Sequence, residues 1–173
     1  MEVNHATSIE QTFNNENLFS NPPGLILVFD NYRGSTPERQ QIAESTMAVR
    51  ALLASYIYHS DLYSGRERPT LCCFAGEHQE GGESGSEKVK EWLTLCGVPE
   101  EKIITRQTTI ITRTDITQLH SLAKEKQITS PLAIVTTNDH LTRTQQEVKS
   151  FCLSPGKTRF RLSYPTSLCI KSI

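Results

Sequence analysis

The chain has 173 residues, with 18 Lys or Arg, 19 Asp or Glu and a formal net charge of -1. That length suits one domain with a substantial core, and the balanced charge gives no electrostatic basis for non-specific binding to nucleic acid or an anionic membrane. No apolar segment approaches the roughly 20 residues of a membrane-spanning helix, and residues 1–20 lack the basic start and apolar middle of a secretory signal. We therefore expect a cytoplasmic protein with no membrane insertion and no nucleic-acid partner. The sequence does not indicate an oligomeric state.

The five cysteines form no CxxC pair and no paired framework; they are Cys72, Cys73, Cys96, Cys152 and Cys169. The first two lie inside an apolar run. This distribution favours reduced thiols within the core over disulfides or metal ligands.

In chain order, residues 1–20 are predicted to be a flexible N-terminal tail and residues 21–173 a single domain. The apolar run 24–30 is typical of a strand buried on both faces. Ser35-Thr-Pro-Glu38 predicts a helix start, because it combines a capping box with Pro in the first turn. Apolar residues then recur at helical spacing and are expected to face the core: Ile42, Val49, Leu52, Leu53, Tyr56 and Ile57. Arg50, in the middle of this helix, is expected at the surface.

Strands and helices continue to alternate along the rest of the chain. Further strands are predicted at 70–75, 102–105 and 131–137, with an edge strand at 158–164. Further helices are predicted from about 86 to 95, from 112 onward and after 138. The fold class that follows is α/β: a three-layer Rossmann-like domain with a mostly parallel sheet of about five strands.

Ligands of such sheets bind outside the carboxyl ends of the strands, near a switch in strand order. The loops at that edge are 30–34, 76–85, 107–112 and 136–143. The Gly-rich stretch 76–86 has neither the spacing of a P-loop or a GxGxxG turn nor that of a GxSxG elbow. Glu77, His78, Glu80 and Glu83 within it suit either a divalent metal or a solvated loop, so no metal site is assigned.

The segment Thr136-Thr-Asn-Asp-His140-Leu-Thr-Arg143 lies where the fourth predicted strand gives way to a helix. Asn138 or Asp139 can cap that helix, which places His140 and Arg143 in its first turn and on one face. A helix N-terminus favours anions, Arg143 adds a bidentate cation and His140 adds a group that can accept or donate a proton. The alternative is an exposed helix start with ordinary polar residues.

These residues resemble the YdcF/SanA/ElyC-like family of small Rossmann-like α/β domains. Val135-Thr-Thr-Asn-Asp-His140-Leu-Thr-Arg143 is similar to the family's Val-Thr-Ser strand end followed by His and, three positions later, Arg. The stretch 91–104, with its Gly-Val-Pro turn, and Thr109-Ile-Ile-Thr112 are similar to two further family segments. The resemblance runs from about residue 24 to 152. It implies a ligand site at this sheet edge and a link to envelope polymer or lipid-carrier metabolism.

The chain also departs from the family pattern. Phe29-Asp-Asn-Tyr-Arg-Gly34 replaces the glycines usual after the first strand, and Thr114 and Asp115 stand where the family has Glu-Asn. The acidic residue that opens the family's second helix has no direct counterpart, and Glu87 or Glu83 could serve in its place, depending on a short gap. An N-terminal membrane segment found in some members is absent from this sequence.

Two functions remain open. The protein either binds a small anionic, nucleotide-like or phosphorylated ligand, or is a transferase or hydrolase acting on such a ligand with His140 as acid/base. No cofactor is required by the sequence. The catalytic candidates are His140 and Asp30, and the expected ligand contacts are Asn31, Thr109, Thr112, Thr136, Thr137, Asn138 and Arg143. Asp30 fits a loop-capping carboxylate as well as a catalytic one, and Thr112 fits an N-cap paired with Asp115 as well as a ligand contact. A domain that binds only protein partners is a third possibility.

Overall fold

The computed structural model describes residues 22–30, 36–75, 84–107, 111–152 and 162–163. Its strands are β1 (Leu25–Val28), β2 (Thr70–Ala75), β3 (Ile103–Gln107), β4 (Leu132–Val135) and β5 (Leu162–Ser163). Its helices are α3 (Pro37–His59), α4 (Gly85–Leu95), α5 (Thr112–Glu125) and α6 (Asn138–Cys152), with short 3-10 turns at Asp61–Tyr63 and Glu100–Lys102. The alternation of strands and helices predicted from the sequence is thus confirmed.

The sheet has the order β3-β2-β1-β4-β5, and all its described pairings are parallel. Its body has four strands rather than the expected five. Of the predicted edge strand 158–164, only Leu162 and Ser163 pair with β4, and the other residues lie outside the described part of the chain. The chain builds outward from β1 to β3 and then returns to β4 on the other side of β1, so the strand order reverses between β1 and β4.

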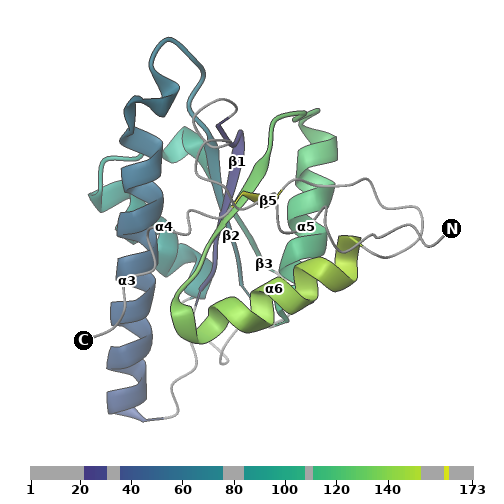
Figure 1. The fold of residues 1–173 in the computed structure, drawn as a ribbon. Helices are drawn as coiled ribbons and strands as arrows, with labels where there is room; N and C mark the ends of the chain where they lie inside the picture. Colours follow the sequence, from purple (N-terminus) through teal and green to yellow (C-terminus); the bar gives the residue numbers. More distant parts are fainter. Residues whose placement is uncertain (1–21, 31–35, 76–83, 108–110, 153–161, 164–173) are drawn as a thin grey trace, which may run out of the picture.

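Helices cover both faces of the sheet, which gives three layers consistent with a Rossmann-like α/β fold. Figure 1 shows α3 and α4 on one side of the strands and α5 and α6 on the other. Alternate side chains of β1 explain this arrangement: Ile26 and Val28 pack in the α3/α4 core, whereas Leu25 and Leu27 pack in the α5/α6 core. Each fully buried side chain of this size contributes about 1.5–3 kcal/mol to the free energy of folding.

The start of α3 is as predicted, but the face that it turns to the core is not. Thr36 is the N-cap, its hydroxyl accepts a hydrogen bond from the Arg39 amide, and Pro37 opens the helix. Four residues expected in the core are instead exposed: Ile42, Val49, Leu52 and Tyr56. The face packed on the sheet carries smaller residues and one methionine: Ala43, Met47, Ala51 and Ala54. Small residues let this helix lie close to the sheet, so the most apolar stripe is not the buried one.

Cys72 and Cys73 are buried free thiols, as predicted, and Cys96 is a half-buried free thiol. Cys152 and Cys169 cannot be compared, because the side chain of the first and all of the second lie outside the described residues. Among the described helices, none combines the length and apolar character needed to cross a membrane.

Candidate functional site

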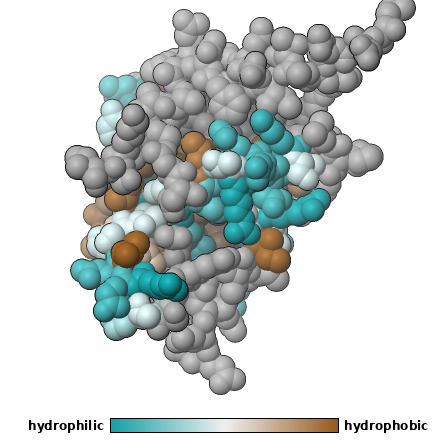
Figure 2. Space-filling model, turned by 60° about the horizontal axis from the view of Figure 1, so that its bottom comes forward, coloured by the Kyte–Doolittle hydropathy of each residue, from teal (hydrophilic) through white to brown (hydrophobic). Residues whose placement is uncertain are grey.

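The carboxyl edge of the sheet brings together the ends of β1 and β4 and the starts of α4, α5 and α6. These three helices follow β2, β3 and β4 respectively, so their N-termini lie at the edge where the parallel strands end. Figure 2 turns this edge toward the reader, and the described residues in that view are mostly hydrophilic, with apolar ones in small separate groups. The described residues of this edge therefore present a mainly polar surface.

Arg50 of α3 lies at the point where the strand order reverses. Its side chain is fully buried, and its Nη1 donates to the backbone carbonyls of Phe29 at 3.2 Å and Asp30 at 2.7 Å. Its Nη2 donates to Thr137 Oγ1 at 2.6 Å, after the end of β4. One guanidinium thus joins α3 to the ends of both central strands. The expectation of a surface position for Arg50 was wrong, because these oxygens provide in the interior the hydrogen bonds that water would provide at the surface.

His140, in the first turn of α6, joins two neighbouring segments of the same edge. Its Nδ1 is 3.1 Å from Thr136 Oγ1, and its Nε2 is 3.2 Å from Thr112 Oγ1 at the start of α5. Its ring also makes an edge contact with Phe29, with 4.9 Å between ring centroids. Because a threonine hydroxyl can donate or accept, this arrangement fits either neutral tautomer of the imidazole. The ring is half-buried and fixed in orientation.

Thr112 is buried, but it does not cap α5. The N-cap residue is Ile111, which makes no side-chain cap bond, and α5 begins at Thr112 itself. The capping-box interpretation of Thr112 with Asp115 was therefore wrong: the Thr112 hydroxyl contacts His140 instead, and Asp115 is buried one turn into the helix.

Asp30 follows β1 and packs against the start of α4. A Cβ atom placed on Gly85 would lie 2.4 Å from Asp30 Oδ2 and 3.1 Å from Asp30 Cβ, so only glycine allows this approach. The same helix start is capped by Ser84, whose Oγ accepts from the Ser86 amide at 3.2 Å and lies 2.6 Å from Ser86 Oγ. The Asp30 carboxyl group thus lies beside a helix N-terminus, where a negative charge is favoured.

The charges at this edge are mixed. Burial raises the pKa of the Cys73 thiol well above its ordinary value; the nearby negative charge of Asp30 raises it further, and the positive charge of Arg50 opposes this. Both charges therefore lie close enough to the centre of β2 to influence it. Arg50 supplies a permanent positive charge beneath the edge, and Asp30 offsets part of it.

The predicted site residues are thus brought together in part. The structure places Thr112 and Thr136 on the two ring nitrogens of His140, and Thr137 on Arg50. The side chain of Arg143 is exposed and forms no hydrogen bond or ion pair with the side chains of the described residues. Asn31, Thr109 and the candidate metal loop Glu77–Glu83 lie outside the described residues, as does the side chain of Asn138. Within the described part of the chain, no group of three or more His, Cys, Asp or Glu is placed to hold a metal ion.

Sequence reasoning missed Arg50, and it did not anticipate the two serines of the α4 start. The sequence signal that could have indicated a buried Arg50 lies in its neighbours. Met47, Ala51 and Ala54 share one face of the helix with it and are all buried. A small-residue face with one arginine predicts close packing on a sheet. The polar partners of that arginine depend on the tertiary arrangement and cannot be predicted from spacing.

Comparison with known proteins gives no assignment: no family model, no curated protein and no solved structure matches this chain. The resemblance to the YdcF/SanA/ElyC-like family stays a prediction from the sequence.

Proposed function

We propose that this protein binds a small anionic ligand, nucleotide-like or phosphorylated, at the carboxyl edge of its sheet, as its resemblance to YdcF/SanA/ElyC-like proteins implies. The observation that carries the proposal is the meeting of the α5 and α6 starts at His140, three residues after Thr137, which the buried Arg50 contacts. Free N–H groups and the positive end of the helix dipole make each helix start favourable for a phosphate or carboxylate.

Fixed and adjustable groups are both present at this edge. His140 contacts both Thr112 and Thr136, and these three residues form a pre-organised polar surface. Arg143, exposed one turn further along α6, is available to form a charge-assisted pair with an anion. Such a ligand would bind between a rigid base and an arginine that orders on binding.

A second function, an enzyme with His140 as acid or base, is favoured by one specific observation. Both ring nitrogens of His140 contact hydroxyl groups, so the imidazole is oriented and can exchange a proton with a group that replaces either hydroxyl. The ordinary pKa of histidine lies near neutral pH, as a general base requires. Asp30 would be the acidic counterpart. In this proposal the reaction is a group transfer or a hydrolysis on the bound ligand.

The test is a thermal-shift screen of the wild-type protein with inorganic phosphate, nucleotides and phosphosugars. We expect at least one of these anions to raise the melting temperature, because a ligand that binds only the folded state stabilises it. Failure of every anion to do so would contradict the site.

Arg143→Ala and Lys149→Ala form a matched pair for this test, since both are exposed cations of α6 and only Arg143 lies near the edge. We expect Arg143→Ala to weaken binding by about 10–100-fold, the range for one charge-assisted hydrogen bond, and Lys149→Ala to leave it unchanged.

With a ligand that raises the melting temperature, the His140→Ala variant separates the two proposed functions. Retained binding with lost turnover supports the enzyme, and lost binding with no turnover in the wild type supports the binding module.

A further inference from the structure

The outer face of α3 carries a stripe of exposed residues that the fold does not use. The stripe consists of Ile42, Ser45, Val49, Leu52 and Tyr56. The side chains of Ile42, Leu52 and Tyr56 are 65%, 60% and 67% exposed, so the core does not cover them. Apolar side chains gathered on one surface of a soluble domain mark an interaction site.

The spacing of the α3 stripe is that of a helix that packs against another helix. Its members follow one another at intervals of three, four, three and four residues. This is the spacing of the a and d positions of a coiled-coil seam over two heptads. The partner surface is therefore expected to be a helix of similar length.

The charges select the kind of partner. Between residues 42 and 56 only two residues are charged, and neither lies on the stripe. Arg50 is fully buried, and Glu44 is half-buried and accepts a hydrogen bond from Gln40 Nε2. An uncharged stripe offers nothing to a phosphate backbone, a lipid headgroup or a charged peptide, and it suits a second uncharged apolar helix face.

The α3 stripe is itself such a face, and its layout is close to symmetric. Around Val49, which lies next to the midpoint of Pro37–His59, Ile42 and Tyr56 are seven residues to either side. Two antiparallel copies of α3 would place Ile42 of one copy opposite Tyr56 of the other and Val49 opposite itself. Glu38, in the first turn, would lie near His59 in the last turn of the other copy, which places an acidic residue beside a basic one.

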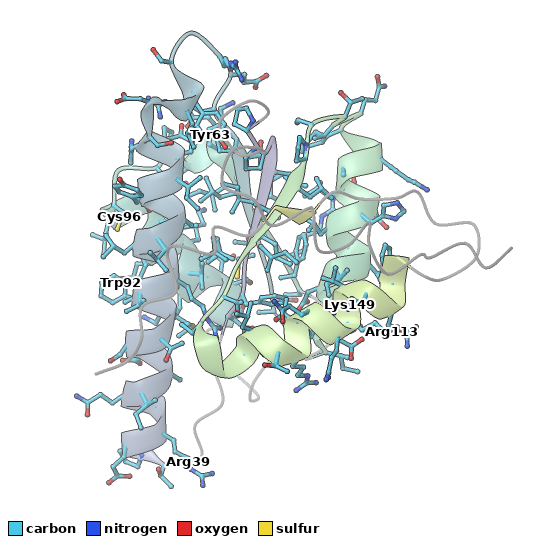
Figure 3. The ribbon with its side chains drawn as sticks, in the orientation of Figure 1. Arg39, Tyr63, Trp92, Cys96, Arg113 and Lys149 are labelled. Carbon is cyan, nitrogen blue, oxygen red and sulfur yellow. The ribbon has the colours of Figure 1, made fainter. Side chains whose placement is uncertain are left out.

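The helix beside α3 extends this surface. Trp92 and Leu95 of α4 are 36% and 70% exposed, and Figure 3 shows Trp92 next to α3. A helix of 23 residues is about 35 Å long, and the flanking side chains of α4 widen the area that it can bury. A stable interface buries roughly 800 Å² per partner, so the exposed side chains of α4 add to the area that the α3 stripe offers.

We infer that the protein forms a two-fold symmetric homodimer in which the α3 stripes of two copies pack antiparallel. This inference does not depend on the proposed ligand site, which lies at the carboxyl edge of the sheet rather than on the outer face of α3. The dimer buries the apolar residues that the monomer exposes.

The first test is sedimentation equilibrium of the full chain over low-micromolar to submillimolar concentrations. We expect a reversible dimer. Val49→Lys places two like charges close to the two-fold axis, so self-association should weaken by about a hundredfold or more. The matched control is Ile111→Lys, another exposed apolar residue that lies outside the stripe, and it should dimerise as the wild type does. A monomeric wild type at all concentrations, or a dimer unaffected by Val49→Lys, would overturn the inference.

The second test addresses orientation and does not depend on a disruptive variant. Ile42→Cys and Tyr56→Cys proteins are mixed and oxidised, with the wild type as a control for its native thiols. Antiparallel packing predicts disulfide-linked dimers that contain one copy of each variant. Cross-links between two Ile42→Cys copies and between two Tyr56→Cys copies, without the mixed species, would instead show parallel packing and would overturn the antiparallel arrangement.

Discussion

At the scale of single residues, Arg50 shows how a charged side chain can belong to the interior of a small sheet protein. Its planar fork of donors reaches the carbonyls of Phe29 and Asp30 and the hydroxyl of Thr137. Because these groups lie at the ends of β1 and β4, the guanidinium fixes the separation of the two strands at the place where the strand order reverses. This is a positioning role toward the proposed site rather than a contact with ligand.

Arg50→Met tests that role. Methionine keeps much of the volume but donates no hydrogen bonds, so one buried carbonyl, one partly buried carbonyl and one partly buried hydroxyl lose a donor. We therefore expect the free energy of unfolding to fall by about 3 kcal/mol. Urea denaturation measures the change. Arg39→Met, on the exposed start of the same helix, should change it by less than about 0.5 kcal/mol. Equal small effects in the two variants would show that the Arg50 hydrogen bonds do not contribute to stability.

At the scale of elements, the sequence was sufficient to predict the four strands of the sheet body but not the face of the longest helix. The continuous apolar run that contains Leu25–Val28 predicts a strand buried on both faces, and that pattern has few alternatives. In α3, hydrophobicity alone favoured the side of Ile42 and Leu52. The sheet instead contacts the alanine side, since the distance between helix and sheet sets how large the facing side chains can be. That distance is a property of the tertiary structure, and the periodicity of apolar residues in the sequence does not predict it.

The contact between Gly85 and Asp30 couples the end of β1 to the start of α4, and Gly85→Ala tests it. The added Cβ would lie 2.4 Å from Asp30 Oδ2, so the carboxyl group must move, and we expect a loss of about 1–3 kcal/mol from the free energy of unfolding. Combining Gly85→Ala with Asp30→Ala removes the closest clash, although Asp30 Cβ at 3.1 Å stays tight.

A double-mutant cycle measured by urea denaturation gives the outcome. Asp30→Ala should lower the free energy of unfolding by less in the Gly85→Ala protein than in the wild type. Strict additivity of the two changes would mean that Asp30 does not pack on the α4 start in solution.

At the scale of the whole molecule, topology explains which part of the site was predictable. Thr112 and His140 are 28 residues apart and in contact. Thr112 follows β3 and His140 follows β4, two strands of one parallel sheet, and the rule that such strands end at one edge predicts that both residues lie there. Arg50 reaches the same edge from the middle of a helix, and no edge rule includes a residue in that position. The loop residues Asn31 and Thr109 stay predictions, since they lie outside the described part of the chain.

The buried thiols of β2 make the stability of the whole domain sensitive to alkali. Burial raises the pKa of Cys72 and of Cys73 above the ordinary value of 9.0, so the folded state keeps both protons when an unfolded chain would release them. Where the unfolded state binds fewer protons, the free energy of unfolding falls as pH rises. The contribution of the thiols is therefore fully present below about pH 9 and is lost progressively above it, by up to about 1.4 kcal/mol per pH unit for each thiol.

Cys73→Ala should make this alkaline loss shallower by up to about 1.4 kcal/mol per pH unit, even though it lowers stability at neutral pH by removing a packed sulfur. Urea denaturation at about pH 7.5 and at about pH 10 measures both effects in one variant. Val89→Ala is the control, because it removes buried volume from the same domain without removing a titrating group, and its pH dependence should equal that of the wild type. If Cys73→Ala and Val89→Ala showed the same pH dependence, the alkaline loss would have to arise from groups other than the Cys73 thiol.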